Sequence, residues 1–569
     1  MTVLGSVEMR RGALEAHTGP WRPRTLDRVL DDVAATHPER PLVITDDRTY
    51  SYADMVAWSM RLARGLSAAG VRAGDHVAMV MANYPEFVAL KFALSRLGAV
   101  AVPINFLFRR DELGFVIGQS DAVLLVTMDR FRNLDYLAAL DELAPGWERA
   151  GGGERFPRLR EVVVFSTDGE RRAGARSLED LASAGDGAAV NGSDASAICD
   201  VVYTSGTTGS PKGVLITHDM LLRTAYASAY TRAFQDGRRI LFSMPLYHVF
   251  GYVEGLLAVI FAGGAIVPQL TFDPVATLAA VGEHRVDEVM FVPTMTLAVL
   301  DTARTKSFDL SSLSVVFSSG GQSPARIWNE IRDLLGAQEI FTAYGMTETT
   351  ASTTCVFPGD PVERLATTCG RFKPAGVAGD PELGGVLAVY KTVDPGTGED
   401  LPAGAVGELV VKGPIVTPGY YKRPDETAAA FDAAGWFRTG DLGRIDEEGF
   451  LTLTGRKKEC YRCGGELVVP KHVEDVLTGH PGVSQAHVVP IPDERMGEIG
   501  VAWVVPDAGA ELDEDELLRH CAEHVARFKV PVRIFFTGAD DLPASASGKI
   551  QKFKLVERTK QALQTGRTA

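Results

Sequence analysis

Short apolar runs alternate with helical segments along the first part of the chain, and this alternation limits the fold more than any other feature. Ser51-Tyr-Ala-Asp54 is a capping-box pattern that opens a helix. The extended run 76–81 is followed by a helical stretch, 85–97, and by an apolar run, 99–102. A strand–helix–strand unit of this kind predicts a parallel sheet.

Further runs rich in Val, Leu and Ile continue the pattern. They span residues 123–126, 162–165, 198–203, 240–243, 289–292 and 315–318. Near-continuous apolar runs are typical of parallel strands that are buried on both faces. We therefore expect an α/β protein whose large N-terminal domain contains two parallel-type α/β subdomains.

The pattern changes after about residue 370, where glycines and prolines separate short strands such as 407–412 and 449–454. This composition predicts a small antiparallel, β-barrel-like subdomain at the end of the large domain. Helical signals at 473–477 and 514–526 follow in a mixed α/β context.

At 569 residues the chain exceeds the size of one hydrophobic core, so two or more domains are expected. A turn-rich stretch at 446–449 precedes the basic run Arg456-Lys-Lys458. We expect a large N-terminal domain over 1–454, a hinge near Lys458, and a small mobile α+β domain over 455–569.

Charge and hydropathy exclude several classes of protein. Lys plus Arg number 58 against 73 Asp plus Glu, and a net charge of −15 disfavours nucleic acid as a partner. The longest apolar stretch, 255–267, is too short to span a membrane and contains two glycines. Residues 1–12 do not resemble a signal peptide, so we expect a cytoplasmic enzyme. Only Cys460 and Cys463 are closely spaced, and a zinc site would need two more ligands.

The segment 203–213 follows an apolar strand and contains three glycines, five Ser/Thr hydroxyls and one lysine. Glycines allow backbone N–H groups to approach phosphate, and Lys212 can add positive charge. The Walker pattern fails because Pro211 stands where its second glycine should be, and Gly213 replaces the Ser or Thr after the lysine. A Gly/Ser/Thr loop that binds no nucleotide is the alternative for such a segment taken alone.

This loop resembles the phosphate-binding signature of the adenylate-forming superfamily, which includes acyl-CoA synthetases, peptide synthetase adenylation domains and firefly-type luciferases. Four further segments match that family in order: Tyr344-Gly-Met-Thr-Glu348, Gly435-Trp-Phe-Arg-Thr-Gly-Asp441, Gly455-Arg-Lys-Lys458 and Pro543-Ala-Ser-Ala-Ser-Gly-Lys549. The resemblance implies an ATP-dependent ligase that activates a small-molecule carboxylic acid as an acyl-adenylate.

By this resemblance the loop holds the ATP triphosphate through Thr204, Ser205, Gly206, Thr207, Thr208 and Lys212. Thr347 is expected to donate to the α-phosphate. Glu348 is expected to bind Mg²⁺, a hard cation that takes carboxylate and phosphate oxygens.

The remaining nucleotide contacts follow from the same resemblance. Tyr344, with Gly345, is expected to stack on adenine against a wall formed by the backbone of Gly320 and Gly321. Asp441 can accept hydrogen bonds from both ribose hydroxyls, because a carboxylate offers two acceptor oxygens. Arg456 is expected to approach ribose or phosphate from the hinge side, and Lys458 is the position about which the C-terminal domain rotates.

Two further residues are expected to act on the reacting carboxylate. Lys549 should stabilise the charge that builds on the α-phosphate as the carboxylate attacks. His248, in Met244-Pro-Leu-Tyr-His-Val-Phe-Gly251, should position the carboxylate, which is already ionised near neutral pH and needs no obligatory base.

The acyl acceptor is expected to be coenzyme A. An amino acid substrate is disfavoured, because Tyr247-His-Val-Phe250 lacks the aspartate that pairs with an α-ammonium group in peptide synthetase domains. The loop 459–466, which includes Gly464 and Gly465 as expected cofactor contacts, departs from the more usual apolar residues of the thiol tunnel. The alternative is therefore an adenylation-only enzyme that hands the adenylate to another enzyme or a carrier protein. A nucleotide-binding regulator without catalysis is the weakest alternative, and the sequence leaves monomer and homodimer both open.

Overall fold

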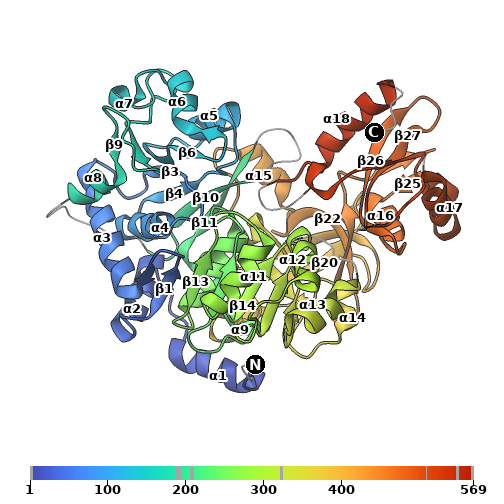
Figure 1. Ribbon diagram of the computed structural model, residues 1–569, viewed down its shortest axis with the longest axis horizontal. Coiled ribbons are helices and arrows are strands. Elements are labelled where there is room, and N and C mark those ends of the chain that lie inside the picture. Colours follow the sequence, from blue (N-terminus) through green and yellow to red (C-terminus); the bar gives the residue numbers. More distant parts are fainter. Residues whose placement is uncertain are drawn as a thin grey trace.

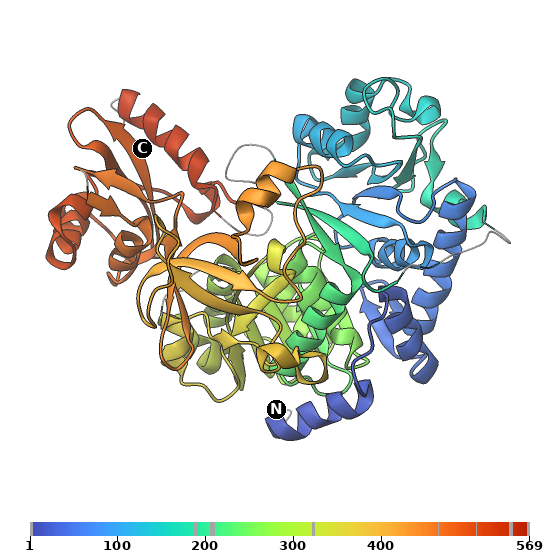
Figure 2. The ribbon, with the colours of Figure 1, turned by 180° about the vertical axis from the view of Figure 1, so that it is seen from behind.

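The computed structural model describes residues 4–565, apart from 186–191, 193, 205–210, 321–324, 465, 508 and 546–549. A large N-terminal domain is followed by a small C-terminal one. Figure 1 and, from behind, Figure 2 show the elements from α16 (Pro470–Thr478) to α18 (Lys552–Thr565) in a lobe beside the larger body.

One predominantly parallel sheet lies in the middle of the large domain. Its strand order is β16 (Glu339–Phe341), β15 (Val315–Ser318), β14 (Glu288–Phe291), β12 (Arg239–Phe242), β13 (Ala265–Pro268), β1 (Pro41–Ile44) and β2 (Thr49–Ser51). The pairings are parallel as far as β1, and β2 adds an antiparallel edge.

A second sheet of the same kind packs beside it. Its order is β11 (Lys212–Thr217), β10 (Ile198–Thr204), β4 (Val100–Pro103), β3 (His76–Val80), β5 (Leu124–Met128), β8 (Glu161–Phe165) and β9 (Arg176–Ser177). The pairings are parallel except that β11 returns antiparallel along β10. The two parallel-type subdomains predicted from the apolar runs are confirmed.

Local sequence signals explain where two of the helices begin and end. Helix α3 (Tyr52–Ala68) begins at the capping box, in which Ser51 and Asp54 exchange side-chain and backbone hydrogen bonds. Helix α4 (Pro85–Leu97) has proline in its first turn and ends at Gly98, whose φ of 72° is the left-handed conformation that glycine adopts without strain. Both helices therefore match the prediction closely.

The apolar stretch at 255–267 lies in the protein core. It begins within η1, a π-helix over Phe250–Leu257, continues through α10 (Ala258–Ile260), and ends in β13. Residues 251–257 of η1 are all buried. Among the helices that the structure describes, none is both long and apolar enough to cross a bilayer.

Antiparallel pairing dominates after residue 370, as predicted. Strands β20 (Val389–Val393), β21 (Gly407–Lys412), β22 (Phe437–Ile445) and β23 (Leu451–Arg456) form one antiparallel sheet. A further sheet, built mainly on the hairpin of β26 (Val483–Asp493) and β27 (Gly497–Pro506), supports α16, α17 (Glu514–His524) and α18. The buried apolar clusters of this last sheet draw their members from Tyr461 onward, so the C-terminal domain has its own core.

A buried histidine makes the stability of the large domain depend on pH. His218 begins α9 (His218–Thr231), is 1% exposed, and accepts a hydrogen bond from the backbone N–H of Leu26 at 3.4 Å. Burial lowers its pKa to about 4 from the ordinary histidine value of 6.5. The unfolded chain therefore binds one more proton than the folded chain between these two values, and the stability falls as pH drops from 6.5 towards 4.

We expect the free energy of unfolding to fall by roughly 2 kcal/mol at pH 5 through this group alone. Urea denaturation at pH 8 and pH 5 measures the loss. In His218→Asn, which keeps an acceptor but does not titrate, the loss should be smaller by that amount. An identical pH dependence in both proteins would contradict the assignment.

Candidate active site

The phosphate loop is the tip of the β10–β11 hairpin. Thr204, the last residue of β10, pairs with Lys212, the first of β11. At the next pair Gly213 lies so close to β10 that a Cβ there would come within 2.5 Å of Val201. Four of the expected triphosphate ligands, Ser205, Gly206, Thr207 and Thr208, lie outside the described residues.

The hairpin is bound to a second segment, 417–421. Leu215 N donates to Gly419 O at 3.1 Å, and Tyr421 N donates to Gly213 O at 2.8 Å. The Lys212 ammonium lies 4.9 Å from the centroid of the Tyr420 ring, within range of a cation–π contact. This segment therefore supports the base of the phosphate loop.

The same segment holds Glu348. The Tyr420 hydroxyl donates to Glu348 Oε1 at 3.0 Å, and Thr417 N donates to Glu348 O at 2.8 Å. Glu348 is 8% exposed, and burial raises the pKa of its carboxyl group. Among the described residues, no cation forms an ion pair with it. Tyr420 was not predicted as a site residue, since nothing in its local sequence separates it from any tyrosine in a turn-rich segment.

The adenine motif forms a tight hairpin of β17 (Ala343–Met346) and β18 (Ala351–Cys355), joined through the short helix η2 (Thr347–Thr349). Thr347 and Glu348 are buried in η2. A Cβ on Gly345 would lie 1.9 Å from Ala351 O, so only glycine allows this approach.

Tyr344 lies close to the expected wall of the adenine site. Its side chain is 7% exposed. Ser319 Oγ donates to Ala343 O at 2.8 Å, which ties the end of β15, and with it Gly320, to the strand that carries Tyr344. Gly320 has a φ of 93°. Gly321 lies outside the described residues.

The predicted ribose carboxylate is part of a triad in which Asp441 and Tyr344 are buried and Arg456 is partly exposed. Asp441 is 3% exposed; its Oδ2 accepts from Tyr344 Oη at 2.7 Å, and its Oδ1 lies 2.9 Å from Arg456 Nε. Asp441 and Arg456 face each other across β22 and β23. A carboxylate has about four lone-pair sites, so both oxygens can still accept from a ligand. The charges of Arg456 and Asp441 also act on the pKa of Glu348, which places the triad near the carboxylate expected to bind Mg²⁺.

The backbone fixes the tautomer of His248. Its Nδ1 accepts from Phe250 N at 3.2 Å, so Nε2 carries the proton of the neutral ring. The loop before it is held by Asn83, which accepts from Leu246 N at 2.8 Å and donates to Met244 O at 3.0 Å. Asn83 was not predicted either, because the sequence does not report a contact that spans more than 160 residues.

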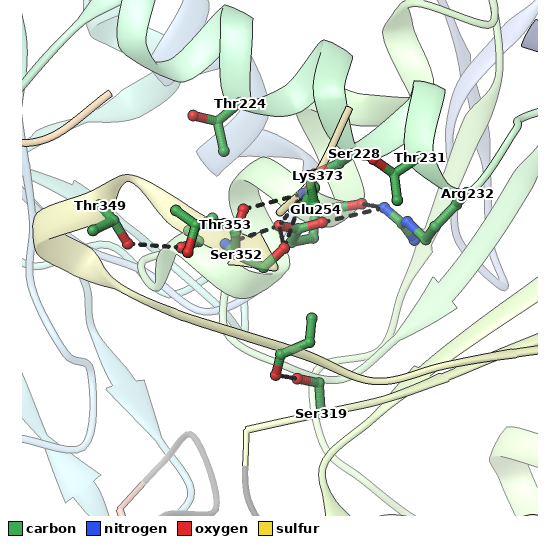
Figure 3. A network of polar contacts seen from close by, with 12 residues as sticks. Thr224, Ser228, Thr231, Arg232, Glu254, Ser319, Thr349, Ser352, Thr353 and Lys373 are labelled. Atoms are coloured by element: carbon green, nitrogen blue, oxygen red, sulfur yellow. Dashed lines mark hydrogen bonds and ion pairs between the residues drawn. The ribbon is translucent and has the colours of Figure 1, made fainter. Parts of the chain in front are cut away.

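A buried network of charges lies behind this site (Figure 3). Glu254, in η1, accepts from Ser352 N at 3.1 Å and faces Lys373 Nζ at 3.3 Å. Lys373 also donates to Ser228 Oγ at 2.5 Å, and Arg232 donates to Glu254 O at 2.5 Å. The network thus joins η1, which follows His248, to β18, which follows Glu348.

The structure describes fewer of the expected site residues in the C-terminal domain. Lys549 and Gly465 lie outside the described residues, and Lys458 is exposed. Gly464 adopts a φ of 61° and donates to Met496 O at 2.8 Å. The segment that leads to Lys549 is closed by a bridge between Ala544 and Ile550.

Next to that segment, Lys552 forms ion pairs with Glu459 at 2.8 Å and with Glu474 at 2.7 Å. These contacts tie the start of α18 to the residue after Lys458 and to α16.

The fold consists of a large N-terminal domain, in which the expected nucleotide residues Tyr344, Glu348 and Asp441 lie, and a small C-terminal domain. A sequence model of the AMP-binding enzyme family matches residues 30–421, and one of the AMP-binding enzyme C-terminal domain matches 472–549. The chain therefore belongs to the AMP-binding enzyme family. Within that family it is an AMP-forming acid–thiol ligase, which activates a carboxylic acid to the acyl-adenylate and transfers the acyl group to coenzyme A.

Relatives of this class cover nearly the whole chain. YngI of Bacillus subtilis (strain 168) is 35% identical over 548 residues, which cover 94% of this chain and 97% of the relative. The medium-chain acyl-CoA ligase ACSF2, mitochondrial, of Danio rerio is 31% identical, with 96% of this chain and 90% of the relative covered. ATP-bound MatB from Rhodopseudomonas palustris has a TM-score of 0.80 at 28% identity and covers 94% of this chain and 99% of its own.

Proposed function

We propose that both half-reactions use the residues assembled around Glu348 and the triad of Tyr344, Asp441 and Arg456. In the first, a carboxylate oxygen of the acid attacks the α-phosphorus of ATP, and the bond to pyrophosphate breaks. In the second, the thiol of coenzyme A loses its proton and attacks the acyl carbonyl, and AMP leaves. The observation that carries the proposal is the bridge by Tyr420, which supports Lys212 and Glu348 from one side chain.

Glu348 fits a divalent cation. It is a buried carboxylate with no ion-pair partner among the described residues, and Mg²⁺ prefers carboxylate and phosphate oxygens. Bound there with ATP, Mg²⁺ would neutralise phosphate charge. Thr347, the neighbour of Glu348, would donate its hydroxyl to the α-phosphate, while Thr204, Lys212 and the residues of the loop hold the outer phosphates.

The triad is proposed to hold the nucleoside. Asp441 accepts from the two ribose hydroxyls while Arg456 and Tyr344 keep its carboxylate in place. The adenine lies between Tyr344, with Gly345, and the backbone at Gly320 and Gly321.

The domain division at 454 and 455 is likewise a proposal, supported by the separate core that begins at Tyr461. Lys458 lies just after β23 and is the pivot. In one orientation Lys549 reaches the α-phosphate; in the other, the loop with Gly464 and Gly465 lines the thiol path. We further propose a cytoplasmic enzyme whose partner is a small-molecule carboxylic acid, with a carrier protein or a partner ligase as the alternative acceptor of the acyl group. Light scattering distinguishes between a monomer and a homodimer.

His248 provides a test of acid positioning. Because its Nδ1 accepts from the backbone, its Nε2–H can donate to the ionised carboxylate of the substrate. We expect His248→Ala to raise the KM for the acid and to lower kcat/KM about 10-fold, the cost of one hydrogen bond to a charged group. His248→Asn tests whether a hydrogen-bond donor alone restores kcat/KM for the acid. Unchanged kinetics in His248→Ala would contradict this role.

The function itself is tested with a panel of carboxylic acids. Acid-dependent exchange of labelled pyrophosphate into ATP reports the first half-reaction, and mass detection of an acyl-CoA reports the second. Exchange without acyl-CoA would identify an adenylation-only enzyme. Tight ATP binding without exchange for any acid would identify a regulator.

A further inference from the structure

Tyr420 contacts the two charged groups expected to handle the phosphates of ATP. Its hydroxyl donates to Glu348 Oε1 at 3.0 Å, and its ring faces Lys212 Nζ at 4.9 Å. Glu348 and Lys212 are 136 positions apart in the sequence and belong to different elements, η2 and β11. One side chain therefore sets the position of a carboxylate and of a cation at the same time.

The backbone of Tyr420 is itself held from two sides. It forms an antiparallel bridge with Val214 of β11, and its N–H donates to Thr427 Oγ1 at 3.0 Å. The preceding Gly419 has a φ of 146°, and a Cβ there would lie 2.5 Å from the Thr427 side chain. Tyr420 is therefore attached through its backbone both to the β10–β11 hairpin and to α15 (Pro424–Ala430).

The Tyr420 hydroxyl restrains the Glu348 carboxylate without using all of its acceptor sites. A phenol donates one hydrogen bond, here to Oε1, whereas a carboxylate offers about four lone-pair sites, so further sites can face a cation. Hydrogen-bond partners of metal ligands orient those ligands, and removing them costs about 10- to 100-fold in metal affinity. The ring adds a separate effect, since it attracts the Lys212 ammonium through its face.

We propose that Tyr420 is a positioning residue for the metal–nucleotide complex, whose hydroxyl orients Glu348 towards the divalent cation and whose ring orients Lys212 towards the phosphates. This inference rests on the proposed function of Glu348 and Lys212. It assigns two separable roles to one side chain: Tyr420→Phe removes the first, and Tyr420→Leu removes both.

Tyr421 provides a matched control. It is the next residue on the same segment, and its hydroxyl also donates to a carboxylate at 3.0 Å, but to that of Asp121. Tyr421→Phe therefore removes an equivalent tyrosine–carboxylate bond without touching Glu348 or Lys212.

The test measures binding without any acid substrate. Free Mn²⁺ is followed by electron paramagnetic resonance in the presence of ATP and protein, and binding of metal-free ATP is measured by calorimetry. In Tyr420→Phe we expect Mn²⁺ affinity in the ternary complex to fall about 10-fold while metal-free ATP binds as in the wild type. In Tyr420→Leu metal-free ATP should also bind more weakly. Tyr421→Phe should match the wild type in both.

The proposal would be overturned if Tyr420→Phe bound Mn²⁺ as tightly as the wild type does. Equal losses of Mn²⁺ affinity in Tyr420→Phe and Tyr421→Phe would also overturn it. So would the absence of any Mn²⁺ binding to the wild-type protein with ATP. Thermal unfolding of each variant shows whether it folds. If Tyr420→Leu does not fold, Tyr420→Phe alone still tests the metal role. A wild type that binds Mn²⁺ and ATP but exchanges no pyrophosphate would contradict the proposed function and not this inference.

Discussion

Lys549→Ala should lower the rate of acyl-adenylate formation by about 10² to 10³-fold, the cost of losing one preorganised donor to a developing charge. As the carboxylate attacks, negative charge grows on the oxygens around the α-phosphorus, and a fixed ammonium stabilises it. Lys549 itself lies outside the described residues, and the residues that flank it are bonded to one another. Ala544 and Ile550 form a bridge on either side of it, and Gln551 N donates to Pro543 O at 2.7 Å.

Acid-dependent pyrophosphate exchange measures this effect, and conversion of a supplied acyl-adenylate to acyl-CoA measures the other half-reaction. The second rate should change only a few-fold, because Lys549 is proposed to leave the site when the domain turns. Lys554→Ala, at an exposed position of α18, is the matched control for loss of a lysine. Near-normal exchange in Lys549→Ala would refute the assignment.

Glu254→Leu should cost about 3–5 kcal/mol in the free energy of unfolding of the large domain, because it leaves the buried ammonium of Lys373 without its ion-pair partner, while Arg232 keeps its pair with Glu288. Glu254 is 1% exposed, Lys373 is 4% exposed and Arg232 is 1% exposed. Burial opposes the charged form of Glu254, yet Lys373 and Arg232 together hold its pKa below the ordinary value. The leucine also takes the acceptor away from Ser352 N.

Urea denaturation followed by tryptophan fluorescence measures the loss. The double variant Glu254→Leu/Lys373→Met should recover a large part of it, because it also removes the ammonium group that the single variant leaves without an ion-pair partner. Asp400→Ala, which breaks the exposed pair with Lys391, should change stability by less than about 1 kcal/mol. If Glu254→Leu lost no more stability than Asp400→Ala, the buried network would contribute little to the free energy of unfolding.

The sequence predicted the elements of this protein better than the contacts between them. Helix α4 could be delimited because a proline and a left-handed glycine mark its two ends, and β15 because its apolar run is unbroken. The expected nucleotide residues follow from motifs in which residue types at fixed spacing report a chemical need. Tyr420 and Asn83 carry no such local signal.

These residues act through partners brought near by the fold. Tyr420 meets Glu348 across 72 positions, and Glu254 meets Lys373 across 119. Glu254 was not predicted as a member of a charged network, and it stands just before the apolar stretch 255–267. Its partners come from a helix, a strand and a loop of different regions, so the local sequence does not report them.

The small domain is packed around its own apolar clusters, so the proposed rotation about Lys458 would not require its core to open. A domain with its own core can change its orientation without exposing buried apolar side chains to water. The free-energy cost of such a motion is then limited to the contacts on the domain surface. Arg326 and Asp507 form one such contact between the domains at 2.6 Å, with 45% and 20% of their side chains exposed. A pair of this kind stabilises the contact between the domains by about 1 kcal/mol or less, so thermal fluctuation is enough to break it.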